Sequence, residues 1–169
     1  MPKRARLQTG YTLIEILIVL FIISIVTSVA MLSIGRNEDK QMQTFANELA
    51  QVMSLAEEQA MLQPVVLGLT LSKHALQFTS YQSEKNAWIP FQDSVLGKQS
   101  IPHAMQVAIE IGGGRTSSLD MAYKKNPQVI VSTNGDVTPF TIYIGKKGER
   151  ARYAVIGDAD GNITQQTLS

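Results

Sequence analysis

The stretch GYTLIEILIVLFIISIVTSVAMLSI, residues 10–34, determines the fold of this chain. Within it, Ile16 to Ile34 form a run of 19 residues without a charge. A helix of that length spans roughly 28 Å, close to the hydrocarbon thickness of a bilayer. Three cations precede the run, at Lys3, Arg4 and Arg6. The positive-inside rule therefore predicts a membrane-spanning helix with a cytoplasmic N-terminus and an exported remainder.

Glu15 is the charged residue inside this apolar stretch. A charge at the centre of a membrane helix costs roughly 2.5 to 3.5 kcal/mol on insertion scales, so the carboxylate needs a reason to be there. Two plainer interpretations stay open: a glutamate at the membrane edge facing lipid head groups, and a signal peptide cleaved near Ser28-Val29-Ala30. A signal peptide has no need for the carboxylate, which favours a retained helix.

The segment Gly10-Tyr11-Thr12-Leu13-Ile14-Glu15 resembles the G-F-T-L-x-E motif of type IV pilins and pseudopilins. The resemblance implies that a prepilin peptidase cleaves the basic leader, residues 1–10, after Gly10 and methylates the new amino group of Tyr11. Tyr11 stands where the family has phenylalanine, and it keeps the aromatic ring. The resemblance also implies an α+β, pilin-like fold, in which a long N-terminal helix packs on a C-terminal antiparallel β-sheet domain.

Cleavage would give Glu15 a nearby positive charge. The ammonium of Tyr11 would lie four residues before the carboxylate, on the same helix face. The carboxylate would also meet the positive end of the helix dipole, and a buried charge needs such compensation or a proton. The resemblance implies that, in filaments, this carboxylate pairs with the first-residue amine of a neighbouring subunit. Glu15 is therefore the predicted residue for assembly and register.

A second helical pattern follows the membrane run, in residues 36–63. From Glu38 to Gln63, apolar residues recur at spacings of three and four, the period of an amphipathic helix. They are Met42, Phe45, Ala46, Leu49, Val52, Met53, Ala56, Ala60 and Met61. Pro64 disfavours helical geometry at Gln63 and ends the element. We expect one helix with a membrane-spanning half, residues 11–35, and an amphipathic half that packs on a sheet.

Residues 64–169 alternate between strand patterns and turn residues, which predicts an exported antiparallel β domain. The expected strands are Val65 to Leu71, Leu76 to Gln82, Trp88 to Phe91, Met105 to Ile111, Gln128 to Thr133, Pro139 to Ile144, Tyr153 to Ile156 and Ile163 to Leu168. Hairpin turns are expected at Ser72-Lys73, Asn134-Gly135-Asp136, Lys146-Lys147-Gly148 and Asp160-Gly161-Asn162. Residues 112–126 are expected to be a mobile connection between two halves of the sheet.

Three segments narrow the resemblance to the H group of minor pseudopilins in bacterial type II secretion systems. They are Leu55-Ala56-Glu57-Glu58-Gln59-Ala60, Asn134-Gly135-Asp136-Val137-Thr138-Pro139-Phe140-Thr141-Ile142 and Gly157-Asp158-Ala159-Asp160-Gly161. They are similar to the helix end, the G-x-x-T-P-F hairpin and the terminal turn of that group. The resemblance implies a structural subunit near the pseudopilus tip that supports protein export across the outer membrane. It implies neither catalysis nor a cofactor.

The implied partners are prepilin peptidase, the other major and minor pseudopilins and the inner membrane, with exported proteins as further candidates. The implied location is the inner membrane of a Gram-negative bacterium, with one membrane pass and a periplasmic β domain that joins the pseudopilus. Two alternatives stay open. One is a minor pilin of a type IV pilus, concerned with pilus assembly or DNA uptake; the other is a signal-anchored periplasmic domain that never assembles.

The charge of the exported part argues against nucleic acid as a partner. The chain has 15 Lys and Arg against 14 Asp and Glu, and removing the three leader cations leaves 12 against 14, a net charge of −2. DNA binding would need the remaining basic residues on one surface. These are Lys124, Lys125, Lys146, Lys147, Arg150 and Arg152. The chain has no cysteine, which excludes disulfides and thiolate metal sites.

Asp158, Asp160 and Asn162 place oxygen atoms at alternating positions, as a calcium loop does. The segment lacks the glycine and the bidentate glutamate at the positions that an EF-hand requires, which favours a hairpin turn over a metal site. His74 and His103 have no serine or carboxylate at a catalytic spacing, so each is expected to be a surface or packing residue.

Two aromatic residues, Trp88 and Phe140, form a candidate interaction surface, because large aromatic side chains dominate interface energetics. Trp88 stands in the sequence Trp88-Ile89-Pro90-Phe91, which has the character of a strand. Packing within the domain is therefore the competing interpretation for Trp88.

Overall fold

A computed structural model of the chain describes residues 12–112, 114–116 and 126–168. The chain divides into two compact units, residues 1–40 and residues 41–169. A single helix, α1 (Leu13–Leu62), begins in the first unit and ends in the second.

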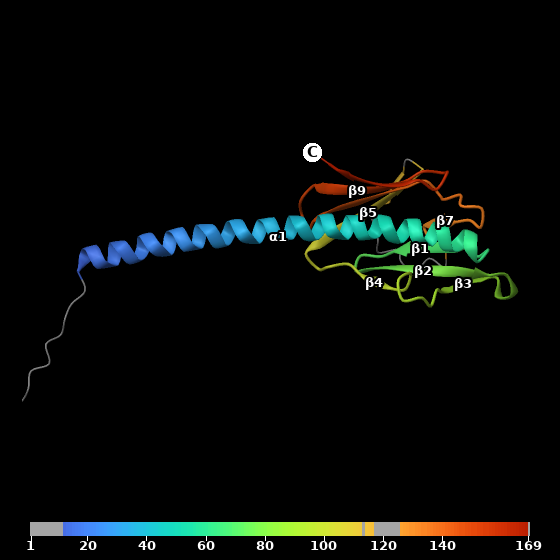
Figure 1. Cartoon of the computed structure of the whole chain (residues 1–169), viewed down its shortest axis with the longest axis horizontal. Coiled ribbons are helices and arrows are strands. Elements are labelled where there is room, and N and C mark those ends of the chain that lie inside the picture. The colour runs from blue at the N-terminus through green and yellow to red at the C-terminus, as the bar shows by residue number, and fades with distance from the viewer. Residues whose placement is uncertain (1–11, 113, 117–125, 169) are drawn as a thin grey trace, which may run out of the picture. The chain divides into compact units, whose positions relative to one another are not determined.

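The described part of the first unit is the apolar beginning of α1, drawn in blue in Figure 1. From Leu13 to Met31 the helix is long and apolar enough to cross a membrane, and none of this segment is buried in the protein. Leu13 is 82% exposed and Phe21 is 65% exposed. Large apolar side chains exposed along 19 consecutive residues need a cover of lipid or of other helices.

In the second unit, α1 is amphipathic and buries one stripe. The buried members are Met42, Ala46, Leu49, Val52, Met53, Ala56 and Ala60, which confirms most of the predicted stripe. The two exceptions are Phe45, which is partly buried against the core, and Met61, which is 43% exposed. The helix ends at Leu62, two residues before Pro64, where the Val65 amide donates to the carbonyl of Ala60 at 3.2 Å.

The described strands form two antiparallel sheets. The first sheet has the order β3-β2-β1-β7, with β4 also paired to β2. Its strands are β1 (Leu67–Leu71), β2 (Ala75–Gln82), β3 (Ala87–Pro90), β4 (Gln99–Ser100) and β7 (Val129–Val131). The second sheet has the order β10-β9-β8-β5-β6. Its strands are β5 (Met105–Ile111), β6 (Gly114–Thr116), β8 (Phe140–Lys146), β9 (Ala151–Gly157) and β10 (Ile163–Thr167). A short 3-10 helix, η1 (Ser83–Lys85), joins β2 to β3.

The core lies between the buried stripe of α1 and the inner faces of both sheets. Alternate residues of the central strands point inward, as Leu67, Leu69 and Leu71 do in β1. Ile142 and Val155 lie opposite each other in β8 and β9 and are both fully buried. These residues and the helix stripe form one hydrophobic cluster. The second part of α1, drawn in teal, runs beside both sheets in Figure 1.

Each of the eight expected strands is present, with ends that shift by at most a few residues. The expected antiparallel β domain is present, and its strands divide between two sheets. The expected connection at residues 112–126 was wrong in part, since Gly114–Thr116 forms β6 against β5. The rest of that prediction, in residues 117–125, lies outside the described residues. The two-residue strand β4 was not expected.

Candidate assembly site

The first turn of α1 is capped by Thr12. Its Oγ1 accepts a hydrogen bond from the backbone amide of Glu15 at 3.3 Å, and its carbonyl accepts from the same amide at 3.1 Å. The spacing of Thr12 and Glu15 is that of a capping box, T-x-x-E. This spacing is visible in the sequence and is a signal for the start of the helix. The cap fixes the residue at which the helix begins and therefore which turn carries Glu15.

Glu15 lies in the first turn of α1 and is exposed. A carboxylate in this position is favourably placed toward the unpaired amides at the helix N-terminus. Gly10 and Tyr11, the predicted cleavage and methylation residues, lie outside the described residues. The pairing of Glu15 with an amine at Tyr11 therefore stays a prediction.

Between Leu13 and Met31, three side chains carry a hydroxyl, and all three bond to the helix backbone. Ser24 Oγ donates to the carbonyl of Leu20 at 2.8 Å, and Ser28 Oγ donates to the carbonyl of Ser24 at 2.8 Å. Thr27 Oγ1 donates to the carbonyl of Ile23. A hydroxyl that bonds one turn back is satisfied without water, so these residues are compatible with a lipid environment.

The candidate signal-peptide site, Ser28-Val29-Ala30, lies inside α1 rather than at its end. Backbone hydrogen bonds of a helix enclose the peptide bonds that a signal peptidase would need in extended form. The described helix continues for 32 residues past Ala30, to Leu62. This continuity favours a retained membrane helix over a cleaved signal.

Trp88 packs on the outer face of the first sheet. Its ring centroid lies 5.3 Å from that of Tyr81, at an interplanar angle of 58°. A Cβ built on Gly68 would lie 2.9 Å from the Trp88 ring and 2.4 Å from Pro127, so both side chains cover the glycine of β1. Trp88 is half-buried in this arrangement. Part of its ring stays available to a partner.

Phe140 does not share that surface. It is 3% exposed, and a Cβ built on Gly157 would lie 2.3 Å from its ring carbon Cε1. Phe140 therefore packs over Gly157, its partner in the β8–β9 register, within the core. A surface formed jointly by Trp88 and Phe140 does not exist in this domain, because Phe140 is buried.

The carboxylate of Glu57, near the end of α1, lies beside two turns, and this position was not predicted from the sequence. A Cβ built on Gly161 would lie 2.6 Å from Glu57 Oε1, and one built on Gly135 would lie 3.4 Å from the same atom. The two turns also bond to each other, since the Val137 amide donates to the carbonyl of Ala159 at 3.2 Å. Glu57 stands in the helix-end segment that carries the resemblance, which was the available signal.

The carboxylate of Asp158 holds the β9–β10 turn. Its Oδ1 accepts from the amides of Asn162 at 2.9 Å and Asp160 at 3.0 Å, and its Oδ2 accepts from Asn162 Nδ2 at 2.9 Å. The Asn162 side-chain and backbone bonds are the main causes that lower the pKa of Asp158. Both oxygens of Asp158 are thus occupied within the turn, which supports the hairpin interpretation. Among the described residues, no group of three or more His, Asp and Glu side chains is placed to hold a metal ion.

His74 and His103 are brought together, although nothing in the sequence pairs them. Their ring centroids lie 5.9 Å apart, and the amide of Ile101 donates to the carbonyl of His74 at 2.9 Å. Both rings are exposed. The exposure of both imidazoles matches the expectation of surface residues.

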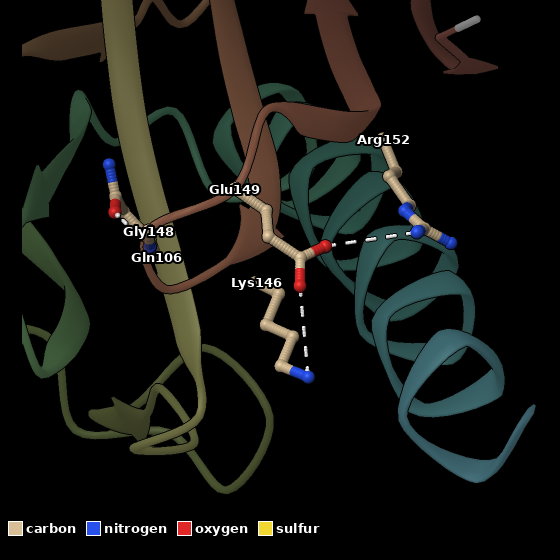
Figure 2. A network of polar contacts seen from close by, with 5 residues as sticks. All are labelled: Gln106, Lys146, Gly148, Glu149 and Arg152. Atoms are coloured by element: carbon tan, nitrogen blue, oxygen red, sulfur yellow. Dashed lines mark hydrogen bonds and ion pairs between the residues drawn. The ribbon is translucent and has the colours of Figure 1, made fainter. Parts of the chain in front are cut away.

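Two of the basic residues at the β8–β9 hairpin lie beside one acidic residue. Glu149 Oε1 lies 3.7 Å from Lys146 Nζ, and Glu149 Oε2 lies 3.7 Å from Arg152 Nη2 (Figure 2). Both pairs are exposed, so each contributes about 0 to 1 kcal/mol. Glu149 reduces the positive charge that a nucleic acid would meet at this hairpin. Lys124 and Lys125 lie outside the described residues.

Comparison with known protein families identifies the family of this chain. Residues 46–161 match the family described as Type II transport protein GspH. The chain belongs to this GspH family. Residues 5–31 match the prokaryotic N-terminal methylation motif, a segment that includes the predicted cleavage site and Glu15. The GspH match covers the last part of α1, from residue 46, and most of the β domain, so it rests on other residues than the methylation motif does.

Similar proteins and solved structures support the same family assignment. The type II secretion system protein H of Aeromonas hydrophila is 29% identical over 93% of this chain and 91% of its own length. That of Pseudomonas aeruginosa is 28% identical over 87% of this chain and 88% of its own. The minor pseudopilin EpsH of Vibrio cholerae has a TM-score of 0.64 at 24% identity, over 75% of this chain and 95% of its own. The fold is therefore pilin-like, and the relatives favour protein secretion over the type IV pilus alternative.

Proposed function

We propose that the chain is a minor pseudopilin of a type II secretion system, a structural subunit near the pseudopilus tip that supports protein export across the outer membrane. The observation that carries the proposal is one helix with two different environments. Its first part is apolar and exposed from Leu13 to Met31, and its second part buries a stripe in a domain of the GspH family. Such a helix can be stored in lipid and later packed against other helices.

The proposed processing divides the chain into four segments. Residues 1–10 are the leader, residues 11–35 the membrane and assembly helix, residues 36–63 the amphipathic half, and residues 64–169 the periplasmic domain. Prepilin peptidase cuts after Gly10 and methylates Tyr11. The match of residues 5–31 to the methylation motif supports this processing.

The proposed mechanism is mechanical. When the helix leaves the lipid, neighbouring pseudopilin helices cover its apolar surface in place of the lipid. The free energy of the helix in the filament is therefore close to its free energy in the membrane. The carboxylate of Glu15 then pairs with the first-residue amine of a neighbour in a medium of low dielectric constant, where opposite charges interact strongly. If the helix is shifted by one turn relative to its neighbour, the Glu15 carboxylate is buried without a partner, and this cost disfavours wrongly registered assemblies.

The test is complementation. A strain that lacks this gene should retain the exported enzymes of its type II system in the periplasm, and the full-length chain should restore their release to the medium. Pilus-dependent motility and DNA uptake should be unchanged. Loss of DNA uptake with normal enzyme release would contradict the proposal and support the type IV pilus alternative.

A further inference from the structure

Strand β10 forms one edge of the second sheet, and its outer side is unpaired. The amide of Asp158 donates to the carbonyl of Asn162 at 3.2 Å, and the amide of Leu168 donates to the carbonyl of Arg152 at 2.7 Å. Even-numbered residues of β10 therefore bond to β9. Because the backbone groups of successive residues point to opposite sides, those of residues 163, 165 and 167 point outward. No hydrogen bond joins these outward groups to another residue in the described part of the chain.

A groove of about 420 Å³ lies beside this edge, between α1 and the start of β10. Its walls are mostly small or apolar, and they carry one carboxylate. The lining residues are Ala50, Gln51, Ser54, Leu55, Glu58 and Ile163. Leu55 is 37% exposed, so the groove leaves apolar surface open to solvent. All of these residues belong to the second unit.

Gln165, also in β10, has a side-chain amide that lacks a hydrogen-bond partner among the described residues. The register places Gln165 opposite Val155, which is fully buried, so Gln165 shares the inner face of the second sheet with Ile163. Its amide nitrogen Nε2 is buried and has no hydrogen-bond partner among the described residues. A buried donor without a partner costs about 1 to 3 kcal/mol, which an incoming acceptor would recover.

We propose that the outer edge of β10 accepts an extended strand of a neighbouring pseudopilin, whose inward side chains fill the groove beside α1. The inference rests on the proposed function. A strand beside β10 would bond to the outward groups of residues 163, 165 and 167 and continue the second sheet over the flank of α1. Its inward side chains must be small or apolar to fit Ala50, Ser54 and Leu55, and a cation among them would face Glu58.

A pseudopilin is the favoured partner because α1 itself forms one wall of the groove. In a filament built from such helices, the neighbours along α1 are other pseudopilins. An exported protein would meet the groove only where no neighbour covers it. Disulfide crosslinking distinguishes a neighbouring pseudopilin from an exported protein as the partner.

Disulfide crosslinking in cells tests the proposal on the full-length chain, which has no native cysteine. Gln166 is exposed, and its backbone is bonded to β9, so Gln166→Cys should face a residue of the added strand at a non-hydrogen-bonded position. Single cysteines are then placed along extended segments of each partner pseudopilin. We expect the strongest crosslink at one residue of one segment, weaker crosslinks two residues away on either side, and none at the intervening residues, whose side chains face the opposite side of the strand. Glu84→Cys, exposed in η1, is the matched control and should give none.

A proline variant tests the backbone bonds themselves. Gln165→Pro removes an outward amide and leaves the β9 pairing intact, because proline is tolerated where a strand amide points away from its neighbour. It should reduce the crosslink at least tenfold, whereas Gln165→Ala, which keeps the amide, should reduce it less. Thermal unfolding of both variants checks that the domain stays folded.

The proposal is overturned by crosslinks without the two-residue period, by crosslinks to an exported protein, or by a yield that Gln165→Pro does not change. It is also overturned if the Gln166→Cys chain restores secretion and crosslinks to no pseudopilin. The proposed function then stands, because secretion is measured in the same cells. If the unmodified chain fails to restore secretion, the proposed function fails instead.

Discussion

Glu57 Oε1 would lie 2.6 Å from a Cβ on Gly161, so the carboxylate at the end of α1 occupies the space that a side chain in the β9–β10 turn would need. Gly161 has a φ of +87°, in the region that favours glycine. A Cβ on Gly161 would also lie 2.7 Å from the carbonyl oxygen of Gly135. This relationship links the amphipathic helix to both turns, and it makes the β domain sensitive to the position of α1.

Gly161→Ala should destabilise the domain more than Gly148→Ala does. Gly148 has a similar φ of +85°, but a Cβ there would meet no atom within 4 Å. Each substitution costs about 1 to 3 kcal/mol for the backbone conformation, and Gly161→Ala adds the contact with Glu57. Denaturant unfolding of the full-length chain in detergent measures this, with fluorescence of its single tryptophan, Trp88, as the signal. Equal losses would show that the Glu57 contact is not tight.

Gly157→Ala should destabilise the domain through Phe140, whose ring lies over the glycine. A smaller side chain at position 140 gives room for the added methyl group. Phe140→Leu should therefore reduce the cost of Gly157→Ala, which a double-mutant cycle measures as a coupling of about 0.5 to 3 kcal/mol. Additive losses in the same unfolding measurement would mean that the two residues do not share this space.

Asp158 should make the stability of the domain depend on pH. Its hydrogen bonds from Asn162 and Asp160 lower its pKa in the folded state, so the unfolded state binds a proton more readily. The stabilisation is present above the ordinary pKa of an aspartate and is lost as the pH falls through the folded pKa. Unfolding of Asp158→Asn should depend less on acid pH than that of the wild type, whereas Asp160→Asn should keep the wild-type dependence. The same pH profile for both variants would contradict this role.

Adding a methyl group at Gly68, on the outer face of β1, should displace Trp88. A Cβ on Gly68 would lie 2.4 Å from Pro127 and 2.9 Å from the Trp88 ring, so Gly68→Ala forces one of them to move. We expect a shift in the emission maximum of Trp88 and a stability loss of about 1 to 3 kcal/mol, typical of overpacking. Unchanged emission and stability would mean that the outer face of the first sheet accommodates the methyl group.

Much of the fold could be predicted because its signals are local. The spacing of Ala46, Leu49 and Met53 indicates a buried helix face, and Pro64 marks where that helix ends. Alternation identifies β5, whose predicted and observed ends agree. The division into two sheets was missed because it depends on pairings such as β1 with β7, between segments far apart in the chain. β4 has two residues and β6 begins with glycine, so neither carries a hydrophobic alternation.

The site was predictable to a similar degree. Glu15 is visible as a charge in an apolar run, and Thr12 was available as a capping residue. The contact of Glu57 with Gly161 joins residues about a hundred positions apart, which no local pattern reveals. The burial of Phe140 depends on its register with Gly157 across two strands, and the sequence does not give that register.

The central claim is that Glu15 serves assembly rather than anchoring. Its most direct measurement is co-purification of the full-length chain with the other pseudopilins from detergent-solubilised membranes. Glu15→Ala should be processed and inserted like the wild type but should lose most of this co-purification, and Glu48→Ala, an exposed glutamate on the same helix that does not line the groove, should retain it. Wild-type co-purification by Glu15→Ala, at equal abundance and with the leader removed, would contradict the account.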